Sequence, residues 1–303
     1  MKTDKLSHAS KSLTGISIGD AFGESFFGEE SVMKTYIHQR ILPETSLDFT
    51  DDTIMSIAIF KSLEKYGEIN QNFLAEEFTK NYYLDINRGY GPSMHQYFRA
   101  VKSGENWKKV SYSKFEGQGS MGNGGAMRAS VIGAYFYDDL KLLKINAELS
   151  CEVTHANKEA IEGTKTIALA AAFAVQEKLG ISIFTPENFI QKIQNELEDS
   201  DMKSKLNKVL HLNGNPSVEL LVKTLGNGIK MTAQDTVPLV VWMLSRYRHN
   251  FEECLWKTVS ALGDRDTTCA MVGGVSILCC DENTIPDWTK NIENWPKSKY
   301  YEN

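Results

Sequence analysis

The adjacent carboxylates Asp51 and Asp52 are the first residues of this chain whose types and spacing suggest chemistry. They stand in the segment FTDDTIMSIAIF at residues 49–60, between Thr50 and Thr53, and an apolar segment with helical periodicity follows them. Asp and Thr often cap helix N-termini, where a carboxylate faces the positive end of the helix dipole. A helix cap is therefore one interpretation. The other is a divalent cation that holds the two like charges together, which requires a second acidic cluster elsewhere.

A second acidic cluster is present in GDRDTT at residues 263–268. Asp264 and Asp266, followed by Thr267, again stand just ahead of an apolar helical segment. The two clusters together offer carboxylate and hydroxyl oxygens, which suit Mg²⁺ or Mn²⁺ better than zinc. If the two helices pack beside each other, we expect two metal ions about 3.5–4 Å apart that share a bridging water. Two unrelated helix caps are the alternative.

Glycine-rich stretches are the other feature of the sequence that suggests a ligand. They occur at residues 15–31, 87–94, 115–128 and 260–274, and we expect irregular segments at helix ends there. Glycine either allows a positive φ or lets the backbone approach a ligand closely. In FEGQGSMGNGGAMR at 115–128, several backbone N–H groups could point at an anion such as a phosphate. A flexible surface loop is the alternative for any one stretch, but several together favour one composite pocket.

The elements that must position these residues are predicted to be helices. Apolar residues recur with a period near 3.6 along the chain, whereas the alternation typical of strands is nearly absent. No Pro- or Ser-rich linker divides the sequence, so we predict an all-α fold, a single compact domain of many helices over residues 1–303. The predicted helices are 53–65, 71–83, 93–103, 138–152, 157–179, 186–198, 216–225, 236–247, 251–261 and 267–280.

Composition narrows the class of protein. The chain has 303 residues, 42% of them hydrophobic, and a net charge of −6 without a basic stripe, so nucleic acid is an unlikely partner. The five cysteines show no CxxC spacing, which favours free thiols in the cytosol over disulfides or zinc. The longest apolar run, residues 167–175, is too short to cross a bilayer, and residues 1–13 have no apolar core for export. We expect a cytoplasmic protein without a membrane anchor.

An ordered set of motifs resembles the ADP-ribosylglycohydrolase family. The set runs from about residue 12 to 280 and consists of TDDT at 50–53, RGYG at 88–91, GSMGNGGAMR at 119–128, TH at 154–155 and GDRDTTCAMVGG at 263–274. The resemblance implies an all-α domain, a centre of two Mg²⁺ ions for which Mn²⁺ could substitute, and removal of ADP-ribose from modified side chains. An ADP-ribosylated protein would then be the substrate and ADP-ribose the product.

The resemblance also assigns residues. It implies metal ligands at Thr50, Asp51, Asp52, Asp264, Asp266 and Thr267. It places the diphosphate and proximal ribose along Gly117, Gly119, Ser120, Gly122 and Asn123, and the distal ribose near Gly89, Tyr90 and Gly91. Adenine is expected between Phe115 and Met121, with Ile229 at the adenosine end and His155 beside the ligand. Without the resemblance, His155 would more often be a structural residue.

The catalytic residues are predicted with one departure from the family pattern. Cleavage at C1 of ribose passes through an oxocarbenium-like transition state, and Asp52 could orient or deprotonate the attacking water. Many family members carry an acidic residue eight positions after the glycine of a GDA motif, but Phe27 stands there in this chain. We expect Glu24 to replace that acid, although Glu29 and Glu30 also lie close in sequence.

Other functions remain possible from the sequence. The main alternative is an ADP-ribose binder or an immunity protein that blocks an ADP-ribosylating toxin, but unpaired carboxylates would be costly in a site without a cation. Magnesium-dependent hydrolysis of a phosphoester lacks a basic phosphate clamp. Among linkages, arginine is weakly preferred over serine, because a guanidinium leaving group carries its own protons.

Overall fold

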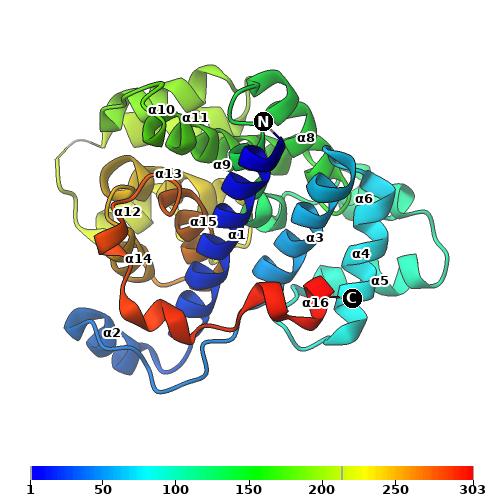
Figure 1. Cartoon of the computed structure of the whole chain (residues 1–303), viewed down its shortest axis with the longest axis horizontal. Coiled ribbons are helices and arrows are strands. Elements are labelled where there is room, and N and C mark those ends of the chain that lie inside the picture. Colours follow the sequence, from blue (N-terminus) through cyan, green and yellow to red (C-terminus); the bar gives the residue numbers. More distant parts are fainter. Residues whose placement is uncertain (1, 213, 303) are drawn as a thin grey trace.

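The segments with helical periodicity all form helices in the computed structural model, which describes residues 2–212 and 214–302 (Figure 1). No β-strand occurs in these residues, so the predicted all-α fold is confirmed. The helices are α1 (Lys2–Glu24), α2 (Glu30–Gln39), α3 (Asp51–Tyr66), α4 (Gln71–Leu84), α5 (Pro92–Lys102), α6 (Trp107–Gly117), η1 (Asn123–Arg128), α7 (Ser130–Tyr135), α8 (Leu140–Glu152), α9 (Lys158–Lys178), α10 (Pro186–Asn195), α11 (Asp201–His211), α12 (Val218–Leu225), α13 (Ala233–Tyr247), α14 (Phe251–Val259), α15 (Arg265–Ser276), η2 (Glu282–Thr284), η3 (Asp287–Asn291), η4 (Trp295–Lys297) and α16 (Lys299–Glu302).

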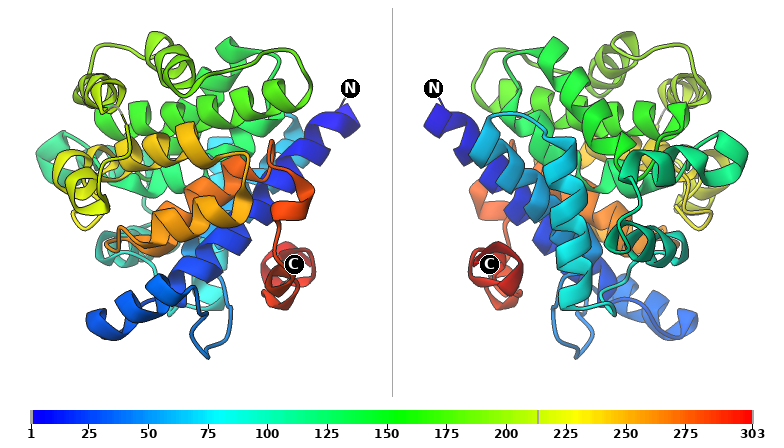
Figure 2. Two further views of the ribbon diagram at one scale, coloured as in Figure 1. Left: turned by 90° about the vertical axis from the view of Figure 1, so that its left-hand side faces the viewer. Right: turned by 90° about the vertical axis from the view of Figure 1, so that its right-hand side faces the viewer.

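The expectation that residues 15–31 form an irregular glycine-rich segment is wrong for residues 15–24, which belong to α1, and holds only for residues 25–29 between α1 and α2. Gly15, Gly19 and Gly23 lie one helical turn apart on one face of α1, where a Cβ would collide with the backbone of α15. Glycine at this spacing lets two helices approach more closely than side chains would allow. Figure 2 shows α1 running obliquely alongside α15. These glycines therefore bring the end of α1 next to the start of α15.

The core of the molecule surrounds the alanine-rich helix α9. Residues 166–175 of this helix are all buried, as its nearly continuous apolar sequence predicted, and Gly180 follows its end with a positive φ. The buried apolar side chains form one continuous cluster that draws on helices from α1 to α16. Helices α7, α8 and α13 and the η1 segment pack against α9. The core therefore fixes the position of η1, the segment that ends at Arg128.

Both acidic clusters stand at helix starts, as expected. Thr50 is the N-cap of α3, and its hydroxyl accepts the backbone N–H of Asp52. Asp264 is the N-cap of α15, but its side chain makes no capping hydrogen bond. Capping thus explains the first cluster only in part and leaves the carboxylate of Asp264 available for another role.

All five cysteines are buried and unpaired. In the described residues, we find no helix with the length and hydrophobicity needed to span a membrane.

Candidate active site

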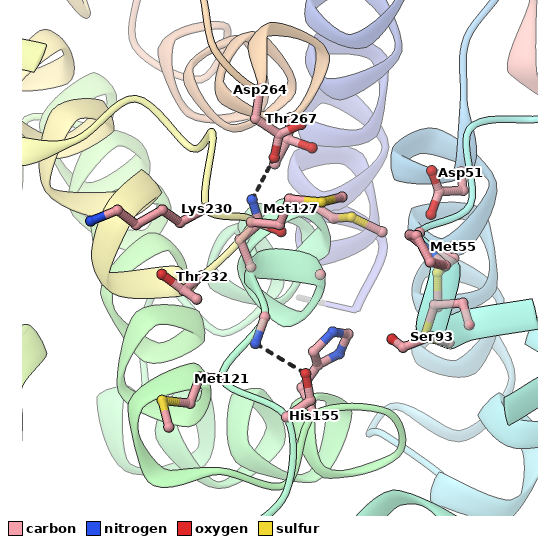
Figure 3. Close-up of a pocket in the computed structure, with 18 of the residues that line it drawn as sticks. Asp51, Met55, Ser93, Met121, Met127, His155, Lys230, Thr232, Asp264 and Thr267 are labelled. Carbon is pink, nitrogen blue, oxygen red and sulfur yellow. Dashed lines mark hydrogen bonds between the residues drawn. The ribbon is translucent and has the colours of Figure 1, made fainter. Parts of the chain in front are cut away.

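A cavity of about 680 Å³ lies where the starts of α3 and α15 face the segment that precedes η1. This volume is within the range of small-molecule sites. On one side it is lined by Asp51, Asp52, Asp264, Asp266 and Thr267, which we call the acidic wall. On another it is lined by residues 118–124, which we call the glycine loop. Figure 3 shows Asp264 and Thr267 at the top of the view, Asp51 to the right and His155 below.

Most of the predicted site residues line this one cavity. Besides the acidic wall they are Gly89, Gly91, Phe115, Gly119, Ser120, Met121, Gly122, Asn123 and His155. The structure therefore brings together motifs that are separated by more than two hundred residues in the sequence. The remaining predicted residues, which do not line it, are Glu24, Thr50, Tyr90, Gly117 and Ile229.

Two predicted ligand-binding side chains point elsewhere. The ring of Tyr90 is buried and packs edge-on against Tyr82 and Phe98, with centroids 5.0 and 5.6 Å away. The side chain of Ile229 is 74% exposed and lies outside the cavity. The sequence motif RGYG correctly locates a loop of the cavity. Gly89 and Gly91 line the cavity, whereas Tyr90 between them packs into the core.

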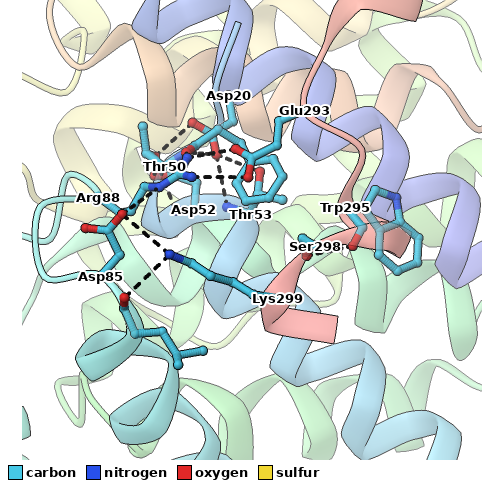
Figure 4. A network of polar contacts seen from close by, with 12 residues as sticks. Asp20, Thr50, Asp52, Thr53, Asp85, Arg88, Glu293, Trp295, Ser298 and Lys299 are labelled. Carbon is cyan, nitrogen blue, oxygen red and sulfur yellow. Dashed lines mark hydrogen bonds and ion pairs between the residues drawn. The ribbon is translucent and has the colours of Figure 1, made fainter. Parts of the chain in front are cut away.

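Asp20 of α1 anchors the start of α3, although it was not among the predicted site residues. Its carboxylate accepts the backbone N–H groups of Thr50 and Thr53 at 2.9 and 3.0 Å and their hydroxyls at 2.8 and 2.6 Å (Figure 4). Burial and the charge of Asp266 raise the pKa of Asp20 to about 7 against these hydrogen bonds. Thr50 therefore stands behind the acidic wall, with its hydroxyl bound to Asp20. The sequence signal that could have identified Asp20 is an acidic residue beside the regularly spaced glycines of α1.

The loop before α5 supports the acidic wall from the other side. The carbonyl of Arg88 accepts the backbone N–H of Asp51 at 2.7 Å, while its guanidinium donates to the carbonyl of Phe49 and pairs with Glu293 at 2.7 Å. Figure 4 shows this network beside Asp20 and Thr50. Gly89 has a φ of 84°, and a Cβ there would lie 3.3 Å from Oδ1 of Asp51. Arg88 thus fixes the backbone that carries Asp51.

The carboxylates of the acidic wall lack the partners that buried charges require. Oδ1 of Asp52 and Oδ1 of Asp266 are buried and have no hydrogen-bond partner. Burial and the neighbouring carboxylates raise the pKa of Asp51 and of Asp52 well above the ordinary value, and they raise that of Asp264 to about 8. Within residues 2–212 and 214–302, no Lys or Arg forms an ion pair with this wall. Such a donor set fits divalent cations, which prefer oxygen ligands.

Oγ1 of Thr267 donates to Oδ2 of Asp52 at 3.4 Å across the two helix starts, but in the described residues no three carboxylates of the acidic wall bring their oxygens within 4.8 Å of one another. Only Glu177, His249 and Cys279 bring three ligand atoms within 4.8 Å of one another in the described residues. That group is better explained as an ion pair, because both oxygens of Glu177 accept hydrogen bonds from Arg248 at 2.7 and 2.9 Å. The open arrangement of the acidic wall suits Mg²⁺, which keeps several water ligands and takes only one or two carboxylates.

The glycine loop is held in place by backbone hydrogen bonds. Gly122 pairs with Thr232 in an isolated antiparallel bridge, and the N–H of Asn123 donates to the carbonyl of Met231 at 3.1 Å. The side-chain amide of Asn123 donates to Asp264 at 2.6 Å. This amide therefore joins the glycine loop to the acidic wall, which explains why both line the same cavity.

A left-handed turn precedes the glycine loop. Phe115, Glu116 and Gly117 have φ values of 51°, 59° and 85°. This conformation costs about 1–2 kcal/mol for each residue that is not glycine. It leaves the Phe115 ring 63% exposed at the rim of the cavity, where a flat group could stack on it. Gly117 shapes this turn and does not itself reach the cavity.

The glutamates near the end of α1 have different surroundings. Burial and the charges of Asp266 and Asp20 raise the pKa of Glu24 to about 7. Glu29 instead caps α2 by accepting the N–H groups of Ser31 and Val32, and Glu30 pairs with Lys34 at 2.6 Å. Among these glutamates, only Glu24 experiences the field of the acidic carboxylates.

Phe27 occupies the position of the missing family acid. Its ring is 46% exposed and lies under the guanidinium of Arg265, 4.6 Å from the centroid. The neighbouring Phe26 is fully buried among Phe22 and Trp256. The ring of Phe27 thus stands where the resemblance predicts an acidic residue, and it contacts Arg265, the first residue of α15.

Comparison with known proteins agrees with the motifs. The profile described as ADP-ribosylglycohydrolase matches residues 1–302. The chain is similar to proteins named ADP-ribosylhydrolase ARH3: 28% identical over 288 residues to that of Gallus gallus, covering 84% of this chain and 76% of the relative, and 29% identical over 325 residues to that of Xenopus tropicalis, covering 94% and 90%. The Homo sapiens protein of that name is 25% identical over 331 residues, covering 94% and 89%. A solved structure titled ADP-ribosylglycohydrolase-related protein complex shares the fold, with a TM-score of 0.61 at 19% identity over 96% of this chain and 94% of that one.

Proposed function

The chain belongs to the ADP-ribosylglycohydrolase family, whose members hydrolyse glycosidic bonds to ADP-ribose, and we propose that its cavity releases ADP-ribose from a modified protein side chain with the help of Mg²⁺. One observation carries the proposal. Buried carboxylate oxygens without partners stand in the same cavity as a neutral loop of backbone donors. The first feature fits divalent cations and the second fits a diphosphate.

The acidic wall would hold the cations through Asp51, Asp52, Asp264, Asp266 and Thr267, with Thr50 fixed behind them. Bound cations would polarise oxygens of the ribose and lower the pKa of a water. Two ions are proposed because the carboxylates come from two helix starts, and in the described residues no three of them bring their oxygens within 4.8 Å of one another. Mn²⁺ has the same ligand preferences and is the proposed substitute.

The protein groups around the anomeric carbon have separable roles. Asp52 keeps one buried oxygen without a protein donor, and with its charge balanced by a cation this carboxylate would orient or deprotonate the attacking water. Glu24 lies outside the lining of the cavity, but its pKa near 7 lets it hold a proton at neutral pH, so we assign it proton donation to the leaving group through an intervening water. In the glycine loop the N–H groups of residues 118, 119, 122 and 123 already donate within the protein, so those of Ser120, Met121 and Gly124 would bind the diphosphate, and Phe115 would stack on the adenine.

The linkage and the compartment remain proposals. The preference for arginine rests on the chemistry of the leaving group, because a guanidinium carries its own protons. A cytoplasmic location is proposed from the five free cysteines.

Incubation with arginine-linked and serine-linked ADP-ribosyl peptides, each with Mg²⁺ or with EDTA, tests the function. We expect free ADP-ribose from one of the two linkages with Mg²⁺ and none with EDTA. Asp138→Ala, a change at a surface carboxylate paired with Lys5, is the control and should remain active. Binding of ADP-ribose without hydrolysis of either linkage would favour the alternative of a binding or immunity protein.

A further inference from the structure

His155 lies at the boundary between the glycine loop and the core. Its side chain is buried, and its ring edge packs so closely on the loop that a Cβ at Gly122 or at Gly124 would come within 2.7 Å of ring atoms. It also lines the cavity (Figure 3). In the described part of the chain, Nε2 of His155 has no hydrogen-bond partner in the protein. The question is which ring nitrogen carries the proton, since that decides whether Nε2 donates or accepts.

The guanidinium of Arg128 sets the direction of the hydrogen bonds behind His155. Arg128 is completely buried, and its Nη2 donates to the carbonyl of Ser150 at 3.0 Å and to Oγ1 of Thr154 at 2.9 Å. Its Nη1 donates to the carbonyl of Gly124 at 2.8 Å. A guanidinium has only donors, so Oγ1 of Thr154 must act as the acceptor in this contact.

The hydroxyl of Thr154 passes this direction on to His155. Oγ1 of Thr154 lies 2.7 Å from Nδ1 of His155, and Thr154 is completely buried. Within residues 2–212 and 214–302, Nδ1 is the only acceptor in reach of the hydroxyl hydrogen. If Nδ1 carried the ring proton, the buried hydroxyl hydrogen would have no acceptor, which is costly. Nδ1 therefore accepts.

We infer that Arg128 and Thr154 are positioning residues that fix His155 as the neutral Nε2–H tautomer, so that it donates a hydrogen bond to a phosphate oxygen of ADP-ribose. The assignment of the tautomer follows from hydrogen bonds within the protein. The identity of the acceptor rests on the proposed function, because the glycine loop beside Nε2 is where the diphosphate is expected.

The surroundings also disfavour the alternative in which both nitrogens are protonated. Burial lowers the pKa of His155 well below its ordinary value, and the nearby charges of Arg128 and Lys114 add to this effect. The imidazole therefore acts as a fixed neutral donor over the physiological pH range. It resembles a backbone N–H group in this respect and extends the neutral character of the glycine loop.

Nitrogen-15 NMR of the histidine rings in the ligand-free protein tests the tautomer directly. His155→Asn assigns the signals among the six histidines. We expect wild-type Nε2 to show the shift of a protonated nitrogen and Nδ1 that of a hydrogen-bonded acceptor. Thr154→Val removes the donor to Nδ1, so the Nδ1 signal should move to that of a free acceptor. The affinity of the Thr154→Val variant for ADP-ribose, measured by calorimetry, should fall about tenfold.

Two further variants separate positioning from simple packing. Thr154→Ser keeps the hydroxyl and should restore both the Nδ1 shift and the affinity. Thr258→Val removes another buried hydroxyl, which donates to the carbonyl of Cys254 away from the cavity, and should change neither.

A proton on Nδ1 of the wild type would overturn the inference, and so would an unchanged Nδ1 shift and affinity in Thr154→Val. The wild-type spectrum decides the tautomer even if Thr154→Val fails to fold. Because the spectrum needs no ligand, a wild type that shows the expected tautomer but neither binds nor releases ADP-ribose would count against the proposed function and the phosphate acceptor, while the tautomer assignment would stand.

Discussion

The acidic wall is made of side chains, whereas the glycine loop across the cavity presents mainly backbone. The wall gathers four carboxylates from the starts of α3 and α15, and two of their oxygens are buried without partners. The glycine loop carries no ionised group, and the N–H of Asn123 and the carbonyl of Met121 are hydrogen-bonded to Met231 and Ala233. Asn123 joins the two by donating to Asp264.

This difference shows which part of the site requires a ligand for its stability. The raised pKa values of Asp51, Asp52 and Asp264 mean that the wall favours protonation or a cation over bare charge. The glycine loop carries no charge that needs a partner, and backbone hydrogen bonds fix its shape. We therefore expect changes in the wall to abolish the chemistry and changes in the loop to weaken binding.

The largest effect is expected from Asp52→Ala and Asp264→Ala. Each removes a proposed cation ligand, so kcat/KM should fall by about a hundredfold or more with saturating Mg²⁺. Without metal, both variants should melt at or above the temperature of the wild type, because one of several repelling carboxylates is gone. Hydrolysis assays and thermal melts in EDTA measure the two effects.

Asp287→Ala, at an exposed surface carboxylate, is the matched control and should leave activity intact. Full activity of Asp264→Ala, together with unchanged binding of Mg²⁺ in calorimetry, would refute the assignment of the wall as a metal centre.

The next effect in size is expected from Glu24→Gln. Its carboxyl has a pKa near 7 and lies in the field of Asp266 and Asp20, so its proposed role is proton transfer in the transition state. We expect kcat to fall about tenfold to a hundredfold, with little change in the affinity for ADP-ribose. Steady-state kinetics and calorimetry separate the two quantities.

Glu29→Gln and Glu30→Gln are the comparison variants, because these side chains cap α2 and pair with Lys34. Loss of turnover in either of them, with normal turnover in Glu24→Gln, would show that the wrong glutamate was chosen.

The acidic wall was predictable because its chemistry lies in residue types and short spacings. Asp51, Asp52, Asp264 and Asp266 are recognisable in the sequence without knowledge of the fold. What remained hidden was the support behind them. Asp20 belongs to a segment that we expected to be irregular, because its glycines were interpreted as loop residues and their spacing of one helical turn was overlooked.

The glycine loop was predictable as a location but not residue by residue. A motif such as RGYG or GSMGNGG marks where the backbone is unusual, yet the direction of each side chain depends on packing against distant elements. Tyr90 turns into an aromatic cluster with Tyr82 and Phe98, and Ile229 faces solvent. The Arg128–Thr154 contacts likewise depend on tertiary structure, since the two residues are joined only where α8 ends beside η1.

A smaller effect is expected on the other side of the cavity from Gly122→Ala. A Cβ there would lie 2.7 Å from Nε2 of His155, so the loop or the imidazole must shift. We expect the affinity for ADP-ribose to fall about tenfold with a modest change in melting temperature, as measured by calorimetry and thermal melts. Gly28→Ala meets only the flexible side chain of Met33 and should bind normally. Equal affinity in Gly122→Ala and wild type would contradict the placement of the ligand along this loop.

The smallest effect is a shift in stability with pH that separates the two sides of the cavity. In the metal-free protein the pKa values of Asp20 and Glu24 are about 7 and that of Asp264 is about 8, all above those of an unfolded chain. At these three carboxyls the folded state then binds more protons than the unfolded state, so their contribution to the free energy of unfolding decreases as the pH rises from about 4 to 8. A cation that replaces these protons stabilises the protein more at high pH.

We expect saturating Mg²⁺ to raise the melting temperature by about 5 °C at pH 8 and by less than about 2 °C at pH 5. Thermal melts of wild type and Asp264→Ala, with Mg²⁺ or EDTA, measure this, and the variant should show a weaker dependence. His155 is neutral in the folded state but binds a proton in the unfolded state below its ordinary pKa, so on the glycine-loop side stability rises with pH, opposite to the acidic wall. The same shift at both pH values would mean that the cation binds away from the acidic wall.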